Sequence, residues 1–439
     1  MKILQYGTRI MRPPKQTDVG QQDLFRNRLD QIIDLNHPLC RLVKLIDWDR
    51  LHKEFSHYYS DVGRSGIPIR MIVGINLLKH IYAVSDEVIC ARWVENPYFQ
   101  HFCGEIFFQH RFPIERSSMS HFRGRIDPSA LEAVLQESLA IACDLGALKL
   151  KDLKSVAIDT TVQEKNAAHP TEHGLMYKAI TKLSKTAHKA GIKLRQSYIR
   201  VVKKASIKVG RYLHAKQMRR AKRELKFIRI RLGRLIRDIE RKVEGVTQEL
   251  PLLFYDTLRK AKQIHRQKKG DPDYLYSWHA PEVECISKGK ARAPYEFGVK
   301  VSLATNLRKS GKKGKHFILH AKAMPGRPYD GHTLKRAGEN IEKIIGKLPE
   351  RFVADKGYKG HKWEDSRTKV YLSGQKRGVT PAIKKDINHR SIIEPIIGHA
   401  KNDGLLRRNY LKGRKGDAIN AILVGTGFNF RQILATLAT

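Results

Sequence analysis

The spacing of apolar residues divides this chain into helical and strand-forming regions. From Ile69 to Tyr82 the apolar positions are dense enough for a helix that is buried on most sides, and Ser85 is placed to cap the helix after it. A short basic segment, 117–126, and a further apolar helix follow. The pattern predicts an all-helical N-terminal domain over residues 1–150, in which 117–126 is a candidate helix-turn-helix segment for DNA.

Two short apolar runs later in the chain each end in an aspartate. Val156–Ile158 leads into Asp159, and Phe352–Ala354 leads into Asp355. Such runs are typical of buried strands, so each would deliver a carboxylate to the edge of a sheet. An aspartate that merely caps a turn is the common alternative for Asp159.

Alternation with a period of two supplies the other strands. Residues 295–303 and 317–323 alternate strictly and predict a hairpin, and 370–372 predicts a further short strand. With the helices between them, these runs predict a mixed-sheet core built from residues 151–162 and 290–439.

The segment between the two parts of this core, residues 163–289, has a helical pattern. The apolar positions from Met218 to Ile239 are spaced 3-4-3-4-3-4, a heptad seam on a long helix. This pattern predicts a helical hairpin or coiled coil, inserted into the core.

The insertion is also strongly basic. Residues 181–240 contain 20 Lys and Arg against 3 acidic residues, whereas a solvated helix face normally alternates in sign. Contact with nucleic acid is therefore the preferred interpretation, and dimerisation with cations for solubility is the alternative. The candidate DNA contacts in this segment are Lys203, Lys204, Arg219, Arg220 and Arg223.

The charge of the whole chain agrees with a nucleic-acid partner. The sequence has 84 Lys+Arg against 43 Asp+Glu, a formal net charge of +41 over 439 residues. The electrostatic field of so large a positive charge favours binding to a polyanion such as nucleic acid. An anionic membrane lacks support, because there is no apolar run of about 18 residues and Met1–Lys15 has no apolar stretch of signal-peptide length. We expect a cytoplasmic protein.

The five cysteines are odd in number and widely spaced, which indicates reduced thiols. His101, Cys103 and His110 could be arranged around zinc, but they lie among phenylalanines. Buried core is the preferred interpretation.

A third carboxylate, Glu394, shares a helix face with Arg390 and Lys401. Pro395 requires this helix to begin only a few residues before Glu394, or to bend there. Alone, this could be a surface ion pair. Together with the two strand-end aspartates, it offers hard oxygen ligands that select Mg²⁺ or Mn²⁺, and two such ions about 3.5–4 Å apart can catalyse phosphodiester cleavage.

The same motifs carry a resemblance to a known family. The matching stretches are Val156–Thr161, Asp330–Leu334, Ala354–Tyr358 and the Arg390-x3-Glu394-x6-Lys401 spacing. They resemble DDE-type transposases with a ribonuclease-H-like core, and more narrowly the insertion-sequence-five family of bacterial elements. The stretch Gly66–Arg125 is similar to the helical N-terminal domain of that family.

The resemblance implies an α+β multidomain protein, in which a ribonuclease-H-like mixed-sheet catalytic core is interrupted by the basic helical insertion. The implied activity is that of a DNA transposase, which cleaves insertion-sequence ends and transfers the freed strand into target DNA. Asp159, Asp355 and Glu394 would be the catalytic residues and would hold two Mg²⁺ or Mn²⁺ ions. The implied partners are double-stranded DNA, at the terminal inverted repeats and the target, and a second copy in a homodimer, in the bacterial nucleoid.

The resemblance also implies DNA contacts. Arg390 would grip a phosphate as a bidentate fork and Lys401 as a point charge, and Lys356 and Tyr358 lie beside the second aspartate. Within the helix-turn-helix candidate, the cations expected to meet DNA are Arg123 and Arg125.

The chain departs from the family at Ile387, where relatives with the fuller motif carry a tyrosine. Two other functions stay open from the sequence. One is a nuclease on the same core that cuts without joining, and the other is a non-catalytic DNA-binding protein in which the carboxylates are dispensable.

Overall fold

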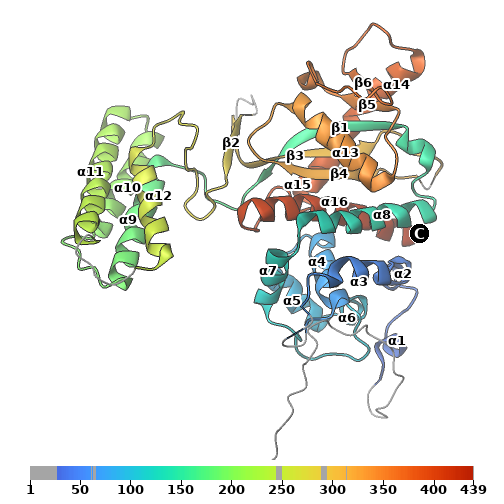
Figure 1. The fold of residues 1–439 in the computed structure, drawn as a ribbon, viewed down its shortest axis with the longest axis horizontal. Helices are drawn as coiled ribbons and strands as arrows, with labels where there is room; N and C mark the ends of the chain where they lie inside the picture. The colour runs from blue at the N-terminus through green and yellow to red at the C-terminus, as the bar shows by residue number, and fades with distance from the viewer. Residues whose placement is uncertain are drawn as a thin grey trace, which may run out of the picture. The chain divides into compact units, whose positions relative to one another are not determined.

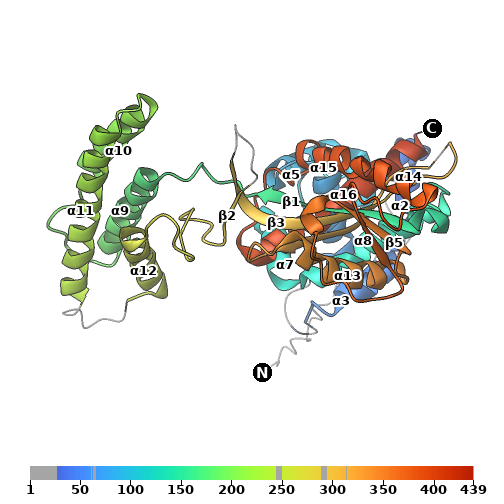
Figure 2. The same ribbon diagram turned by 90° about the horizontal axis from the view of Figure 1, so that it is seen from above.

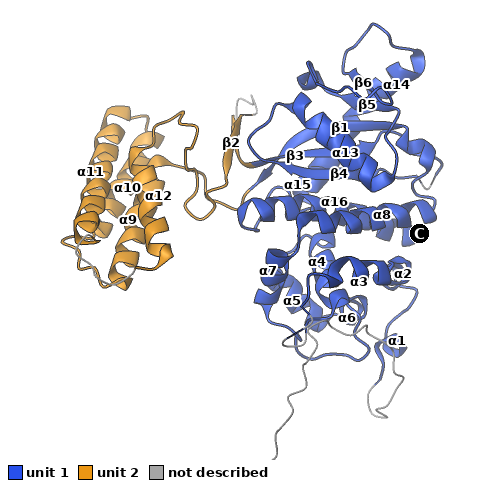
Figure 3. Cartoon of the chain, viewed as in Figure 1, with its two compact units in different colours: residues 1–164, 299–439 blue, residues 165–298 orange. Residues whose placement is uncertain are grey.

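The computed structural model describes residues 27–60, 62, 66–243, 250–287, 294–312 and 314–438. The expectation for Met1–Lys15 lies outside these residues. The chain forms two compact units, residues 1–164 with 299–439 and residues 165–298 (Figure 3). We describe each unit by itself, and the predicted division into three domains stays a prediction.

The first unit combines helices with a mixed sheet (Figure 1). Its helices are α1 (Leu29–Ile32), α2 (Pro38–Leu45), α3 (Trp48–Ser56), α4 (Ile69–Ile81), α5 (Asp86–Glu95), α6 (Pro97–Phe102), α7 (Arg116–Arg125), α8 (Leu131–Asp144), α13 (Leu334–Ile345), α14 (Pro381–His389), α15 (Ile393–Asn402) and α16 (Gly413–Leu437). Short 3-10 turns connect them at η1 (Pro128–Ala130), η2 (Leu150–Leu153), η3 (Asp330–Thr333), η4 (Lys356–Tyr358) and η5 (Arg390–Ile392).

The strands of this sheet lie in the order β4-β3-β1-β5-β6. They are β1 (Ser155–Glu164), β3 (Tyr295–Asn306), β4 (Ile318–Met324), β5 (Arg351–Ala354) and β6 (Lys369–Leu372). The β3–β4 pair is antiparallel, which confirms the predicted hairpin, and β1, β5 and β6 run parallel to one another. The sheet is therefore mixed, as expected.

Both faces of the central strands are buried, which explains their dense apolar sequences. Val156 and Phe352 pack into the core that includes α13, whereas their neighbours Ala157 and Val353 pack on the opposite face with Ile393. Because successive side chains of a strand point to opposite faces of the sheet, the strands pack against α13 on one face and against α14 and α15 on the other.

Helix α16 joins the sheet to the N-terminal helices. It packs against β4 and also against α2, α4 and α8 (Figures 1 and 2). The contact is close because two glycines lie in it: a Cβ on Gly425 would be 3.0 Å from the Ala321 Cβ, and one on Gly427 would be 2.6 Å from the His80 carbonyl oxygen.

The second unit is a helical bundle with a short strand. Its helices are α9 (Glu172–Lys189), α10 (Ile199–His214), α11 (Met218–Val243) and α12 (Leu252–Arg266), and β2 (Glu284–Ser287) pairs antiparallel with the first residues of β3. The heptad seam of α11 faces this bundle: Ile228, Leu232 and Ile239 are fully buried with residues of α9, α10 and α12. The seam is used inside the unit, whereas the alternative of a dimerising coiled coil required it to be exposed.

None of the described helices has both the length and the apolar character needed to cross a membrane.

Candidate functional site

Asp159 and Asp355 meet because their strands are parallel neighbours. The β1–β5 register pairs Val156 with Phe352 and Ala157 with Val353. Continued by two residues, the same register sets Asp159 opposite Asp355, at the place where β5 ends. Parallel pairing thus brings together two carboxylates that are far apart in sequence, as expected. Only Asp355 follows the end of its strand; the prediction that Asp159 ends its strand is wrong, because β1 continues to Glu164.

Asp355 is held by the turn that follows it. Its Oδ1 accepts a hydrogen bond of 2.8 Å from the Gly357 N–H and so caps η4. A Cβ on Gly357 would lie 2.9 Å from the same oxygen. The glycine therefore keeps the space beside the Asp355 carboxylate open.

A further carboxylate, Asp330, belongs to this site although the sequence did not lead us to name it there. It opens η3, and its Oδ1 accepts hydrogen bonds of 2.7 Å from the Thr160 hydroxyl and 2.7 Å from the Lys300 ammonium. Its Oδ2 lies 3.5 Å from the position that a Gly357 Cβ would take. The signal was present, because Asp330 opens one of the motifs that resemble the transposase family.

Tyr358 lies beneath these carboxylates. Its side chain is 0% exposed, and its hydroxyl makes no well-formed hydrogen bond among the described residues, although the Thr333 side chain lies near it. Burial raises the pKa of this phenol well above its ordinary value, the negative charges of Asp159, Asp330 and Asp355 raise the pKa further, and Thr333 lowers it. Tyr358 was expected to contact DNA. The structure buries its ring completely, so the ring has no surface available for contact with a duplex.

The Asp159 carboxyl has a perturbed pKa. Burial raises the pKa of this group to about 6, and the charges of Asp355 and Asp330 add to the rise, against the Thr160 N–H and the Arg390 guanidinium, which lower it. The Thr160 N–H donates to Asp159 Oδ1 over 2.7 Å. Burial therefore disfavours the ionised form of Asp159, and a cation bound beside it would stabilise that form.

Arg390 connects Glu394 to Asp159, because its guanidinium contacts both carboxylates. The guanidinium of Arg390 lies 3.4 Å from Asp159 Oδ2 through Nη1 and 2.9 Å from Glu394 Oε1 through Nη2. The Arg390 side chain is largely buried, whereas that of Glu394 is 61% exposed. The helix that carries Glu394 begins at Ile393, which confirms the start that Pro395 requires.

The other predicted residues of the core have the following places. The Lys401 ammonium is 3.9 Å from Glu164 Oε1, at the end of β1. Lys356 is exposed, and its side chain passes within 3.1 Å of the position of a Cβ on Gly374. Ile387, at the position of the family tyrosine, is buried in the apolar cluster on the α14 face of the sheet.

No metal-binding cluster is formed as the side chains stand. Within the described residues, no three His, Cys, Asp or Glu side chains come close enough together to hold a metal ion, and this covers His101, Cys103 and His110. The donor set around Tyr358 still fits a hard divalent cation, because it consists of carboxylate oxygens beside a buried hydroxyl that makes no well-formed hydrogen bond within the described residues. The carboxylates would have to draw together around the ion.

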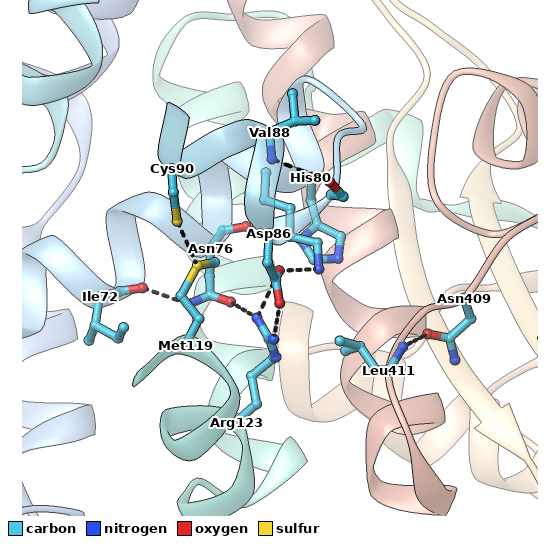
Figure 4. Close-up of polar contacts among 12 residues, drawn as sticks. Ile72, Asn76, His80, Asp86, Val88, Cys90, Met119, Arg123, Asn409 and Leu411 are labelled. Carbon is cyan, nitrogen blue, oxygen red and sulfur yellow. Dashed lines mark hydrogen bonds and ion pairs between the residues drawn. The ribbon is translucent and has the colours of Figure 1, made fainter. Parts of the chain in front are cut away.

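The N-terminal helices place the predicted DNA-contacting arginines differently. Arg123 is buried at 7% exposure, and its guanidinium donates to Asp86 and to the Asn76 side chain, while the Lys79 ammonium also meets Asp86 (Figure 4). Arg123 thus stabilises the packing of α7 on α4 and α5, in place of the DNA contact predicted for it. Arg125 is exposed and lies over the Tyr59 ring.

The predicted cations of the second unit are all at the surface. Their side chains are exposed on α10 and α11, on the far side of each helix from the bundle core, and they are Lys203, Lys204, Arg219, Arg220 and Arg223. Exposure of a basic helix face is the condition that DNA contact requires, and the contact itself stays a prediction.

Comparisons with known proteins give the chain a family and a similarity for its N-terminal helices. Residues 27–125 match the family described as a transposase domain, DUF772. The uncharacterized protein ORF8 in the nfe locus of Rhizobium meliloti is 46% identical over 207 residues, which are 47% of this chain and all of that protein. No solved structure matches the chain. The chain belongs to the same family as ORF8, and its N-terminal residues 27–125 are similar to the transposase domain DUF772.

Proposed function

We propose that this protein is a DDE-type DNA transposase of the insertion-sequence-five kind, with a ribonuclease-H-like catalytic core. The observation that carries the proposal is the meeting of Asp159 and Asp355 at matching positions of two parallel strands, with Arg390 joining Asp159 to Glu394. The strand order, with an antiparallel hairpin beside parallel strands, supports the same core.

In this proposal Asp159, Asp355 and Glu394 hold Mg²⁺ or Mn²⁺, two ions in all. When bound, these ions supply Lewis-acid activation of water or of a 3′-OH and stabilise the leaving oxygen. The chain's own residues position the DNA. Arg390, in η5, would exchange its carboxylate partners for a backbone phosphate, and Lys401, in α15, would contact a neighbouring phosphate.

DNA cleavage with purified protein tests this function. The substrate is duplex DNA that carries the sequences flanking the coding region, incubated with Mg²⁺ or Mn²⁺ and a target plasmid. Asp159→Ala, Asp355→Ala and Glu394→Ala should each abolish cleavage and strand transfer while leaving DNA binding in a gel-shift assay largely intact, because the basic surfaces remain.

The outcomes separate the proposed function from its alternatives. Metal-dependent cleavage that persists in any of the single variants would overturn the assignment of that residue to the metal site. Cleavage without joining would identify a nuclease on this core. Binding without cleavage by the wild-type protein would identify a non-catalytic DNA-binding protein.

A further inference from the structure

Asp330 has a fixed place in the molecule, because its turn fits tightly against the turn that follows Asp355. A Cβ on Gly331 would lie 3.2 Å from the Tyr358 carbonyl oxygen and 3.1 Å from the His361 Cα. The Tyr329 hydroxyl donates to the Lys359 carbonyl over 2.6 Å. These contacts join η3 to η4, so Asp330 moves with the Asp355 turn as one piece.

The two carboxylate oxygens of Asp330 have different surroundings. Oδ1 accepts from both the Thr160 hydroxyl and the Lys300 ammonium, at 2.7 Å each. Oδ2 makes no hydrogen bond that the described part of the chain provides, and it is the oxygen on the Gly357 side. Anchoring through one oxygen leaves the other oriented and free to act as a ligand.

The space between Asp330 and Asp355 is kept clear by glycine. A Cβ on Gly357 would contact Asp355 Oδ1 at 2.9 Å and approach Asp330 Oδ2 at 3.5 Å, so oxygens of both carboxylates border the same small volume. Two carboxylates that share such a volume repel each other unless a cation lies between them.

The buried hydroxyl of Tyr358 is a second observation at this site. It is fully buried, it makes no well-formed hydrogen bond among the described residues although the Thr333 side chain lies near it, and the charges of Asp159, Asp330 and Asp355 all act on it. A buried hydroxyl without a well-formed hydrogen bond is costly, whereas water held by a metal ion in the carboxylate cluster would satisfy it.

We propose that Asp330 is a fourth carboxylate of the active site and that its Oδ2 is a ligand, directly or through water, of a divalent cation bound beside Asp355. This inference rests on the proposed function. The competing explanation is structural: Asp330 only anchors Thr160 and Lys300. That role needs Oδ1 alone, which an asparagine side chain would retain.

Binding of Mn²⁺ to the full-length protein without DNA, followed by electron paramagnetic resonance, tests this proposal. Asp330→Asn should weaken Mn²⁺ binding by roughly tenfold or more, since even indirect partners of a metal site change affinity by about 10- to 100-fold. Asp365→Asn is the matched control: its side chain is 29% exposed against 31% for Asp330, and it also pairs with a cation, Arg367. This control should bind Mn²⁺ as the wild-type protein does.

Lys300→Met separates the ligand role from the structural one. If Asp330 only anchors Lys300, then Lys300→Met and Asp330→Asn should change Mn²⁺ affinity together. If Asp330 is a ligand, Lys300→Met should bind Mn²⁺ at least as tightly as wild type, because the competing ammonium is gone. Parallel losses in the two variants, or wild-type affinity in Asp330→Asn, would overturn the proposal.

Two further variants complete the design. Asp330→Cys should add a thiolate-to-metal charge-transfer band with Cd²⁺ that neither wild type nor Asp365→Cys shows. If Asp330→Asn does not fold, the Asp330→Cys variant tests the proposal: the band would support Asp330 as a ligand, and its absence would overturn that assignment. Asp355→Asn distinguishes the two levels of inference: unchanged Mn²⁺ affinity there would refute the metal site of the proposed function, whereas a loss there with no loss in Asp330→Asn would refute Asp330 alone.

Discussion

Arg390 and Glu394 lie one helical turn apart, and the guanidinium Nη2 is 2.9 Å from the carboxylate Oε1. In a site proposed to bind metal, this pairing places a protein cation against one of the expected ligands. The same guanidinium also reaches Asp159. Arg390 therefore competes with the proposed metal ions for the carboxylates of Asp159 and Glu394. Binding of a DNA phosphate to Arg390 would end this competition.

The first prediction follows from this competition. Without DNA, Arg390→Ala should bind Mn²⁺ more tightly than wild type, because two carboxylates lose their cationic partner. It should bind duplex DNA about 10- to 100-fold more weakly, the effect of losing a hydrogen bond to a charged group. Arg390→Lys is the control that keeps the charge without the fork. Weaker Mn²⁺ binding in Arg390→Ala would contradict the competition.

The second prediction concerns the pH dependence of stability in metal-free protein. The pKa of Asp159 is about 6 when folded against an ordinary value of 3.8. Between these pH values the folded state holds more protons than the unfolded state, so this group's contribution to stability is present below pH 3.8 and is lost as pH rises through about 6. In EDTA, Asp159→Asn should remove that loss and stabilise the protein at pH 8 by on the order of 1–2 kcal/mol.

Urea unfolding at several pH values, followed by tryptophan fluorescence, measures this effect. Trp48, Trp93 and Trp363 lie in the first unit, so the signal reports mainly on the unit that contains Asp159. An identical pH dependence in wild type and Asp159→Asn would show that Asp159 is not the group that titrates.

The third prediction concerns a buried ion network that fixes α14 to the sheet. The Asp386 carboxylate is 1% exposed and contacts the Arg308 guanidinium at 2.5 Å, that of Arg351 at 3.1 Å and the Ser155 hydroxyl at 2.9 Å. Asp386→Ala should lower the free energy of unfolding by about 1–3 kcal/mol, because the buried Ser155 hydroxyl and two partly exposed guanidinium groups lose their common partner.

Glu350→Ala is the control for that network. Glu350 also pairs with Arg351, but its side chain is 45% exposed, so the loss should be about 0.2–1 kcal/mol. Thermal or urea unfolding of both variants measures the difference. Equal losses would show that burial of the Asp386 network contributes nothing beyond a surface pair.

The fourth prediction concerns the basic face of the second unit. Each phosphate neutralised on duplex DNA contributes about −0.9 to the slope of log K against log salt. The double variant Lys203→Gln/Lys204→Gln should flatten that slope by about 1 to 2. Arg259→Gln/Lys262→Gln is the matched control, because those cations are already paired with Asp256 and Glu240 and should leave the slope nearly unchanged.

The slope is measured by titrating DNA binding at several salt concentrations. An unchanged slope in Lys203→Gln/Lys204→Gln would remove this face from the DNA-binding surface. Leu232→Lys gives a separate check on the seam: because Leu232 is 0% exposed inside the bundle, we expect this change to destabilise the second unit and to leave the oligomer mass unaffected.

The sequence by itself determined the elements of this protein. The period of two located β3 and β4, short apolar runs located β1 and β5, and a cap and a proline located the starts of α5 and α15. Asp355 follows its strand as predicted, whereas β1 continues past Asp159 to Glu164. These features are local: apolar spacing, capping and proline geometry act within a few residues, so the chain shows them without its fold.

Only the tertiary structure decided which side chains meet. It buried Arg123 against Asp86, turned the α11 seam into the interior of its own bundle, and brought Asp330 beside Asp355. Each of these depends on contacts between segments far apart in sequence. Parallel strand pairing and close backbone contacts at glycines determine which of the many cations and carboxylates become neighbours. Local spacing carries no information about that choice, because it depends on packing that forms only when the whole unit folds.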